Sequence, residues 1–145
     1  MRGEVGAHDV RLLLPQLGLA ARDWGPREAP RVLALHGWLD NAASFDRLAP
    51  RLDGFRVVAL DLPGHGRSDR LPVACGHHFV DWVATVIATA DALGWDRFSL
   101  LGHSMGAGIS SLVPAVIPDR IDRLVLLEGF GPMADDPEAA PAGLA

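Results

Sequence analysis

Four short apolar runs recur along the chain, and each opens with an arginine. They are RVLAL (31–35), RVVAL (56–60), RFSLL (97–101) and RLVLL (123–127). None of them alternates apolar and polar residues, so each predicts a strand that is buried on both faces of a parallel sheet. The segments between the runs are long enough for the crossover helices that parallel neighbours require.

The longest of these segments has the period of an amphipathic helix. Within HHFVDWVATVIATADALGW (77–95), one helical face carries Phe79, Trp82, Val83, Val86, Ala90 and Leu93. This spacing predicts a helix with one apolar stripe. Asp81 lies near its start, where the helix dipole favours negative charge, and Gly94 is expected as its C-cap.

Three weaker elements complete the pattern. A second helix is expected to begin at or just after Ser104, and Pro114 should kink or end it. A shorter helix is expected over residues 44–51, with Ser44 as its N-cap. Residues 10–25 predict two weaker strands that form a hairpin at the sheet edge. Together these elements predict an α/β fold with a mainly parallel sheet of about six strands and flanking helices.

The stretch LLGHSMGAG (100–108) carries the pattern Gly-x-Ser-x-Gly around Ser104. It directly follows a predicted buried strand and directly precedes a predicted helix, the setting that a nucleophile elbow requires. In such a turn the serine adopts strained dihedral angles, and Gly102 and Gly106 relieve clashes around it. The serine hydroxyl would then lie at a helix N-terminus, where developing negative charge is favoured.

The stretch DLPGHGRSDR (61–70) predicts a structured loop after the second parallel strand. Its glycines and proline set the turns, while Asp61, Arg67 and Ser68 can pair polar groups within the loop. The alternative is a phosphate-binding loop, but the pattern G-x-x-x-x-G-K-[ST] is absent from the sequence. The sequence therefore favours a structural role for this loop.

These two stretches and LHGWLDNAASFDRLAP (35–50) resemble the three N-terminal signature blocks of the α/β-hydrolase fold family, in the family's order and spacing. The similarity runs from about Leu12 to Pro132. It is strongest to the serine hydrolase-like branch, in which a short Gly-Pro stretch like GFGP (129–132) follows the sixth strand. The resemblance implies the fold but no particular substrate.

The resemblance also implies roles for individual residues. Ser104 matches the nucleophile, and the backbone N–H groups of Met105 and Trp38 match the oxyanion hole. Trp38 can alternatively, or additionally, form a wall of the substrate pocket. Glu128 lies where some relatives place the catalytic acid, although a strand-end glutamate that pairs with loop amides is the alternative. Two further acids in the tail, Asp135 and Asp136, are weaker candidates.

The catalytic histidine has no counterpart in this sequence. All six histidines precede Ser104, whereas the family's histidine follows the eighth strand; they are His8, His36, His65, His77, His78 and His103. His103 adjoins Ser104, but neighbours in a tight turn point apart, which makes it a poor base for that serine. The location of the base is therefore not predicted.

The sequence thus predicts the N-terminal part of an α/β-hydrolase over residues 1–132, with residues 133–145 as a truncated tail or the start of a cap. The last strands and the histidine loop are not matched. The implied activity is hydrolysis of ester-like small substrates (carboxylic esters, lactones or related acyl compounds) through an acyl-enzyme on Ser104, although this fragment is expected to be inactive. The alternatives are a non-catalytic remnant, or a chain that a partner completes through an open sheet edge, which favours self-association.

Composition excludes several other classes. The net charge of −5 argues against a nucleic-acid partner. Cys75 is the single cysteine, which fits a reducing cytoplasm. No secretory signal and no apolar window of membrane-spanning length is present in the sequence. No cofactor and no metal are implied by the resemblance, and the expected partner is a small acyl substrate.

Overall fold

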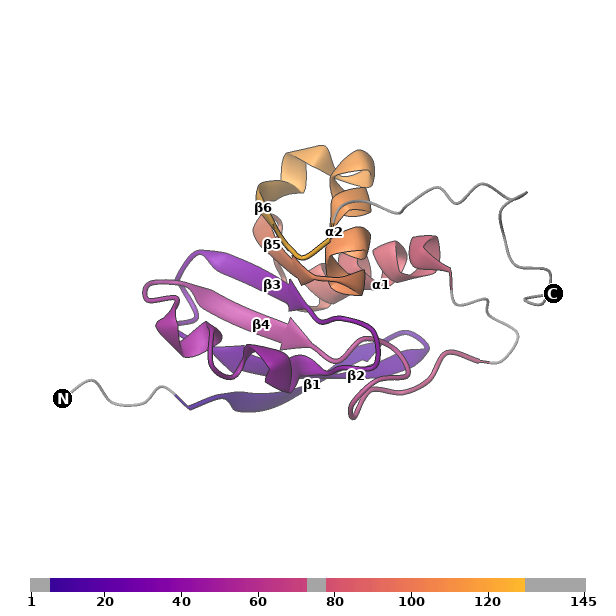
Figure 1. The fold of residues 1–145 in the computed structure, drawn as a ribbon, viewed down its shortest axis with the longest axis horizontal. Coiled ribbons are helices and arrows are strands. Elements are labelled where there is room, and N and C mark those ends of the chain that lie inside the picture. The colour runs from indigo at the N-terminus through magenta and orange to yellow at the C-terminus, as the bar shows by residue number, and fades with distance from the viewer. Residues whose placement is uncertain (1–5, 73–77, 130–145) are drawn as a thin grey trace.

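The computed structural model describes residues 6–72 and 78–129, and in this part of the chain six strands form one sheet (Figure 1). The strands are β1 (His8–Leu14), β2 (Leu17–Trp24), β3 (Arg31–Leu35), β4 (Arg56–Leu60), β5 (Phe98–His103) and β6 (Ile121–Leu127). The helices are α1 (Phe79–Ala92) and α2 (Met105–Val116), with the short 3-10 helices η1 (Ala42–Phe45), η2 (Ala49–Arg51) and η3 (Pro118–Arg120). Outside the described residues lie Cys75, His77, Asp135, Asp136 and the proposed boundary at 132/133.

The sheet is parallel wherever the four arginine-led runs meet. Its strand order is β1-β2-β4-β3-β5-β6, and β3 pairs in parallel with both β4 and β5, while β5 pairs in parallel with β6. The N-terminal hairpin is also confirmed, because β1 pairs with β2 in antiparallel register at the sheet edge. β2 then pairs antiparallel with β4. The predicted α/β class with a mainly parallel sheet is therefore correct.

Alternation along the central strands divides the core between the two faces of the sheet. Leu33 and Leu35 of β3 belong to one core cluster, together with apolar residues of α1 and α2. Val32 and Ala34 face the other way and pack in a second cluster with Phe45 of η1. Figure 1 shows α1 and α2 together beside β5 and β6. Both faces of β3 are thus buried, which explains the continuous apolar sequence of this strand.

Two helix predictions need correction. The single helix expected over residues 44–51 is wrong: η1 and η2 take its place, and the side chain of Asn41, not Ser44, accepts the capping hydrogen bond from Ala43 N–H. Pro114 does not end α2, which continues to Val116. A proline removes one backbone hydrogen bond, and so close to the C-terminus that loss affects only the last turn.

The prediction that RLVLL forms a strand buried on both faces is wrong in one respect. It forms β6, but Leu124, Val125 and Leu127 are 39%, 46% and 38% exposed. β6 lies at the edge of the sheet and pairs only with β5 among the described strands. The apolar run therefore predicted the strand correctly, while its expected burial on both faces does not hold for a strand at the edge of the described sheet.

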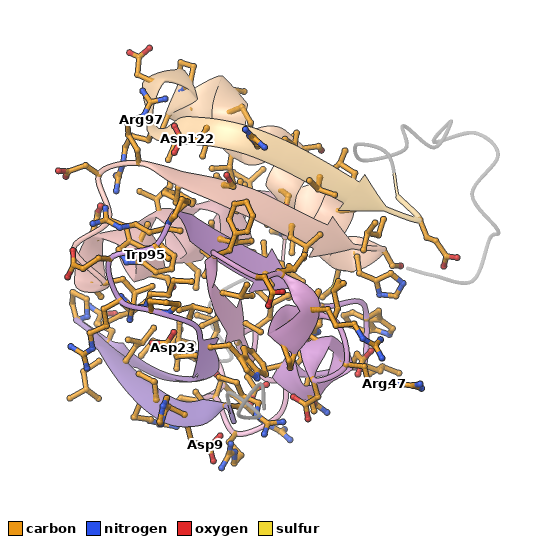
Figure 2. The ribbon with its side chains drawn as sticks, turned by 90° about the vertical axis from the view of Figure 1, so that its left-hand side faces the viewer. Asp9, Asp23, Arg47, Trp95, Arg97 and Asp122 are labelled. Atoms are coloured by element: carbon orange, nitrogen blue, oxygen red, sulfur yellow. The ribbon has the colours of Figure 1, made fainter. Side chains whose placement is uncertain are left out.

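Ion pairs lie at the end of the sheet where the parallel strands begin. Arg97, just before β5, binds Asp122 of β6 at 2.5 Å, and Figure 2 shows the two side chains together. Arg56 of β4 binds Asp23 of β2 at 2.7 Å, and its guanidinium carbon lies 5.4 Å from the centre of the Trp95 ring. These contacts lie at the end of the sheet opposite the carboxyl ends of β3, β5 and β6, where open α/β sheets bind ligands.

Candidate active site

Ser104 occupies the sharp turn between β5 and α2. Its φ of 50° and ψ of −113° are strained for a residue with a side chain, and the residue is exposed. Two sets of backbone hydrogen bonds hold it there. Its N–H donates to the carbonyl oxygen of Leu127 at 2.9 Å, and its carbonyl accepts from the N–H groups of Ala107 and Gly108. The chain therefore fixes the strained conformation from both β6 and α2, as a nucleophile elbow requires.

Two glycines make this turn sterically feasible. A Cβ on Gly102 would clash with the carbonyl oxygen of Gly106 and would lie 2.6 Å from the Cα of Ala107. A Cβ on Gly106 would clash with the carbonyl oxygen of Leu35 in β3. Real Cβ atoms do not approach backbone so closely, because such overlap is strongly repulsive. Both glycines of the Gly-x-Ser-x-Gly pattern are thus explained by close packing of β5, α2 and β3.

The loop after β3 brings the second predicted oxyanion residue beside the nucleophile. A Cβ built on Gly37 would lie 3.4 Å from the Cβ of Ser104. Trp38 directly follows Gly37 in the sequence. Met105 is the first residue of α2, where N–H groups have no partner within the helix. No hydrogen bond from the N–H of Trp38 or Met105 is found within residues 6–72 and 78–129. Both N–H groups are therefore available to a ligand oxygen.

Glu128 emerges from the end of β6 and contacts a histidine rather than Ser104. It has a positive φ of 51°, and its side chain is 86% exposed. One carboxylate oxygen, Oε2, lies 3.7 Å from Nε2 of His103, which is beyond hydrogen-bond distance. The pair places a carboxylate and an imidazole at the carboxyl ends of β5 and β6, the same end of the sheet as the nucleophile. In the part of the chain that the structure describes, Ser104 Oγ makes no hydrogen bond to either group.

His36 has a structural role. It is completely buried, and its Nε2 accepts a hydrogen bond of 3.0 Å from the N–H of Leu62. Its Nδ1 therefore carries the proton and donates to the carbonyl oxygen of Gly37 at 2.7 Å. Burial lowers the pKa of the imidazole, because a charged ring would lose its hydration. His36 thus links the loops after β3 and β4 as a neutral side chain.

The loop DLPGHGRSDR is held by its own polar groups, which confirms its structural interpretation. The Asp61 carboxylate is buried and accepts hydrogen bonds from the N–H groups of Ala42 and Arg67 at 2.7 and 2.9 Å. The Ser68 hydroxyl donates to the Asp61 carbonyl and accepts from Ala20 N–H. The side chain of Arg67 points away from this network and pairs with Asp9.

A crevice of about 510 Å³ opens beside this loop, and the sequence motifs did not predict it. Its lining includes Trp38, Leu39, His65, Arg70, Leu71 and Trp82. The rings of Trp38 and His65 meet edge to face with centroids 5.7 Å apart, and His65 meets Trp82 in the same way at 6.0 Å. Trp38 lines this crevice, while its predicted role as a wall of the substrate pocket stays a prediction. For the other residues that line the crevice, the only sequence signal was the apolar stripe of α1, which contains Trp82.

None of the helices in the part of the chain that the structure describes is both long enough and apolar enough to cross a bilayer. Likewise, residues 6–72 and 78–129 contain no group of three or more His, Cys, Asp or Glu side chains that could hold a metal ion.

Comparison with known proteins identifies the family. A profile of the alpha/beta hydrolase fold matches residues 30–145. Serine hydrolase-like proteins from Dictyostelium discoideum and Homo sapiens are 43% and 40% identical to the chain, over 129 and 121 residues. The chain therefore belongs to the alpha/beta hydrolase fold family, as its three sequence blocks indicated.

Solved structures agree on the fold. A hypothetical protein from Pseudomonas aeruginosa PAO1 is 49% identical, with a TM-score of 0.86 over 92% of this chain and 47% of its own. A thioesterase domain from the curacin biosynthetic pathway is 31% identical, with a TM-score of 0.81 over 90% of this chain and 49% of its own. The Dictyostelium and human relatives are matched over 87% and 83% of this chain, but only over 36% and 60% of their own lengths.

Proposed function

We propose that this chain carries the nucleophile and oxyanion hole of a serine hydrolase that acts on ester-like small substrates: carboxylic esters, lactones or related acyl compounds. The observation that carries the proposal is the strained, exposed Ser104 at the start of α2, with two unpaired N–H groups nearby. Acyl chemistry is supported by similar proteins, which include the curacin thioesterase and a bifunctional esterase/perhydrolase of Acinetobacter calcoaceticus.

In the proposed reaction, Ser104 Oγ forms a bond to the substrate carbonyl carbon while a base takes its proton. The carbonyl oxygen becomes an oxyanion and accepts hydrogen bonds from the N–H groups of Trp38 and Met105. The tetrahedral intermediate collapses, the C–O bond to the leaving alcohol breaks, and the proton passes from the base to that alcohol. Water then attacks the acyl-enzyme in the same manner and releases the acid.

We propose that the base comes from outside the described residues, as the family resemblance implies. His36 is buried in a structural role, and His103 faces Glu128. We propose Glu128 as the acid that orients the incoming histidine, because its exposed carboxylate lies on the sheet edge that carries Ser104. A cytoplasmic location remains part of the proposal and is supported by the presence of a single cysteine.

The isolated 145-residue chain is expected to hydrolyse 4-nitrophenyl acetate no faster than its Ser104→Ala variant. Without a base the serine hydroxyl is a weak nucleophile, and general-base catalysis contributes about 10²- to 10⁴-fold. The measurement is initial-rate absorbance, with stoichiometric labelling by a fluorophosphonate followed by mass spectrometry. Rapid labelling of Ser104 in this chain would contradict the expected inactivity, whereas slow labelling is compatible with an incomplete site.

A second candidate function is binding through the open edge of the sheet. β6 exposes Leu124, Val125 and Leu127, and the last two line an apolar hollow of about 350 Å³ with Val32 and Leu101. An edge strand with unpaired backbone groups can add a strand from another chain. We propose that a second copy of this chain pairs along β6 and thereby covers the hollow.

Val125→Lys is expected to shift the chain from a concentration-dependent dimer towards a monomer in analytical ultracentrifugation. The lysine charge would have to be buried in the paired state, which costs several kcal/mol unless it finds a partner. Val116→Lys, at an exposed position on α2, is the matched control and should leave the association unchanged. A wild-type chain that sediments as a monomer at all concentrations would reject this candidate.

A further inference from the structure

The crevice beside the nucleophile combines aromatic walls with one positive charge. Trp38 of its lining directly follows Gly37, which lies against Ser104, and the ring contacts continue from Trp38 through His65 to Trp82. A crevice of about 510 Å³ falls within the range of small-molecule sites, which is about 300–1,000 Å³. Its walls suit the apolar body of a substrate whose reactive carbonyl rests at Ser104.

The charge in this crevice belongs to Arg70, and none of the described residues neutralises it. Neighbouring arginines are paired: Arg67 binds Asp9 at 3.0 Å, and Arg11 binds Asp69 at 2.5 Å. For Arg70, no ion pair or hydrogen bond is found in the part of the chain that the structure describes. The crevice lining contains no aspartate or glutamate. A guanidinium in this setting matches a carboxylate, which it can bind through two parallel N–H···O hydrogen bonds.

We propose that the crevice binds substrates that carry a carboxylate, with Arg70 pairing the carboxylate and Trp38 and Trp82 flanking the apolar body. The substrate class is then an ester or lactone with a free acid group on its acyl part, such as a half-ester of a dicarboxylic acid. This inference deepens the proposed function, because it assigns specificity to the same site. The binding step itself needs neither a base nor an activated serine.

The test compares two probes of matched shape, 4-phenylbutyrate and the neutral 4-phenylbutan-1-ol, by isothermal titration calorimetry at low salt. We expect the carboxylate to bind about fivefold more tightly, as an exposed charge pair allows, and the preference to fall as salt is raised. Arg70→Gln should abolish the preference, and Arg70→Lys should retain part of it. Arg27→Gln removes an equally exposed arginine near the amino end of β3 and should change nothing.

Several results would overturn the proposal. They are equal affinity of the wild-type chain for both probes, no binding of either probe, or an unchanged preference in Arg70→Gln. Circular dichroism and the urea midpoint of each variant show whether the fold is retained, and Arg70→Lys supplies a second variant if Arg70→Gln is unstable. Slow or absent fluorophosphonate labelling of Ser104 is expected for this chain and does not bear on the probe preference. Failure of the probe preference therefore concerns Arg70 alone, whereas the proposed acyl chemistry is tested by labelling once a base is supplied.

Discussion

Replacing Gly106 by alanine is expected to lower the free energy of unfolding by about 3 kcal/mol or more, and the melting temperature by about 10 °C. The added Cβ would clash with the carbonyl oxygen of Leu35 and would lie 2.7 Å from that of His36. Both acceptors are backbone atoms of β3 and the loop after it. β3 cannot withdraw, because it is paired with β4 on one side and β5 on the other. The measurement is urea unfolding followed by tryptophan fluorescence.

Gly6→Ala is the matched control, since a Cβ at that position would meet nothing within 4 Å. Its urea midpoint should equal that of the wild-type chain within error. If Gly106→Ala also had the wild-type midpoint, α2 would have to move away from β3 at little cost. The close packing that holds Ser104 in its strained turn would then be looser than the structure indicates.

The sequence predicted those elements whose structure depends on local pattern. Continuous apolar runs predicted β3, β4 and β5, because strands buried on both faces need apolar side chains on both. The helical stripe predicted α1, including Asp81, whose carboxylate accepts from His78 N–H, and Gly94, whose φ is 68°. The elbow at Ser104 was predicted because it needs two glycines at fixed positions, and that requirement is visible in sequence.

What the sequence did not predict depends on contacts between distant segments. The exposure of β6 follows from its position at the edge of the described sheet, whereas the apolar run alone is compatible with an edge or a buried strand. The contact between His103 and Glu128 joins two strand ends that are adjacent only after folding. The crevice likewise unites Trp38, Arg70 and Trp82 from three segments, none of which carries a motif for it.

In the proposed function, the reaction is divided between two parts of the sheet. Ser104 and the proposed oxyanion donors belong to the turn after β5, to α2 and to the loop after β3, and backbone hydrogen bonds hold Ser104 in place. Glu128 and His103 lie at the ends of β6 and β5, next to an edge that is open in the described residues. The first part would bind and polarise the carbonyl. The proton transfers would depend on a base supplied from outside the described residues.

Supplying the missing general base is expected to raise the reaction rate of Ser104 by about 10³-fold, which lies in the range that a positioned base contributes. The donor is the part of the Pseudomonas aeruginosa protein that follows the matched region, since this chain covers 47% of that chain at a TM-score of 0.86. The two polypeptides are co-expressed, or joined in one chimaeric chain because separate halves can fail to associate. The measurements are the rate constant of fluorophosphonate labelling and the hydrolysis of 4-nitrophenyl acetate.

Ser104→Ala in the completed chain should abolish both signals, because the labelled oxygen is then missing. Glu128→Gln separates the two assignments of the acid. If Glu128 orients the histidine, this variant loses most of the gain, as triad members act as a unit. If the acid comes from the added segment, Glu128→Gln keeps the gain and the role proposed for Glu128 is rejected. A folded chimaera without any increase in labelling would instead reject Ser104 as a nucleophile and favour binding through β6 as the function of this chain.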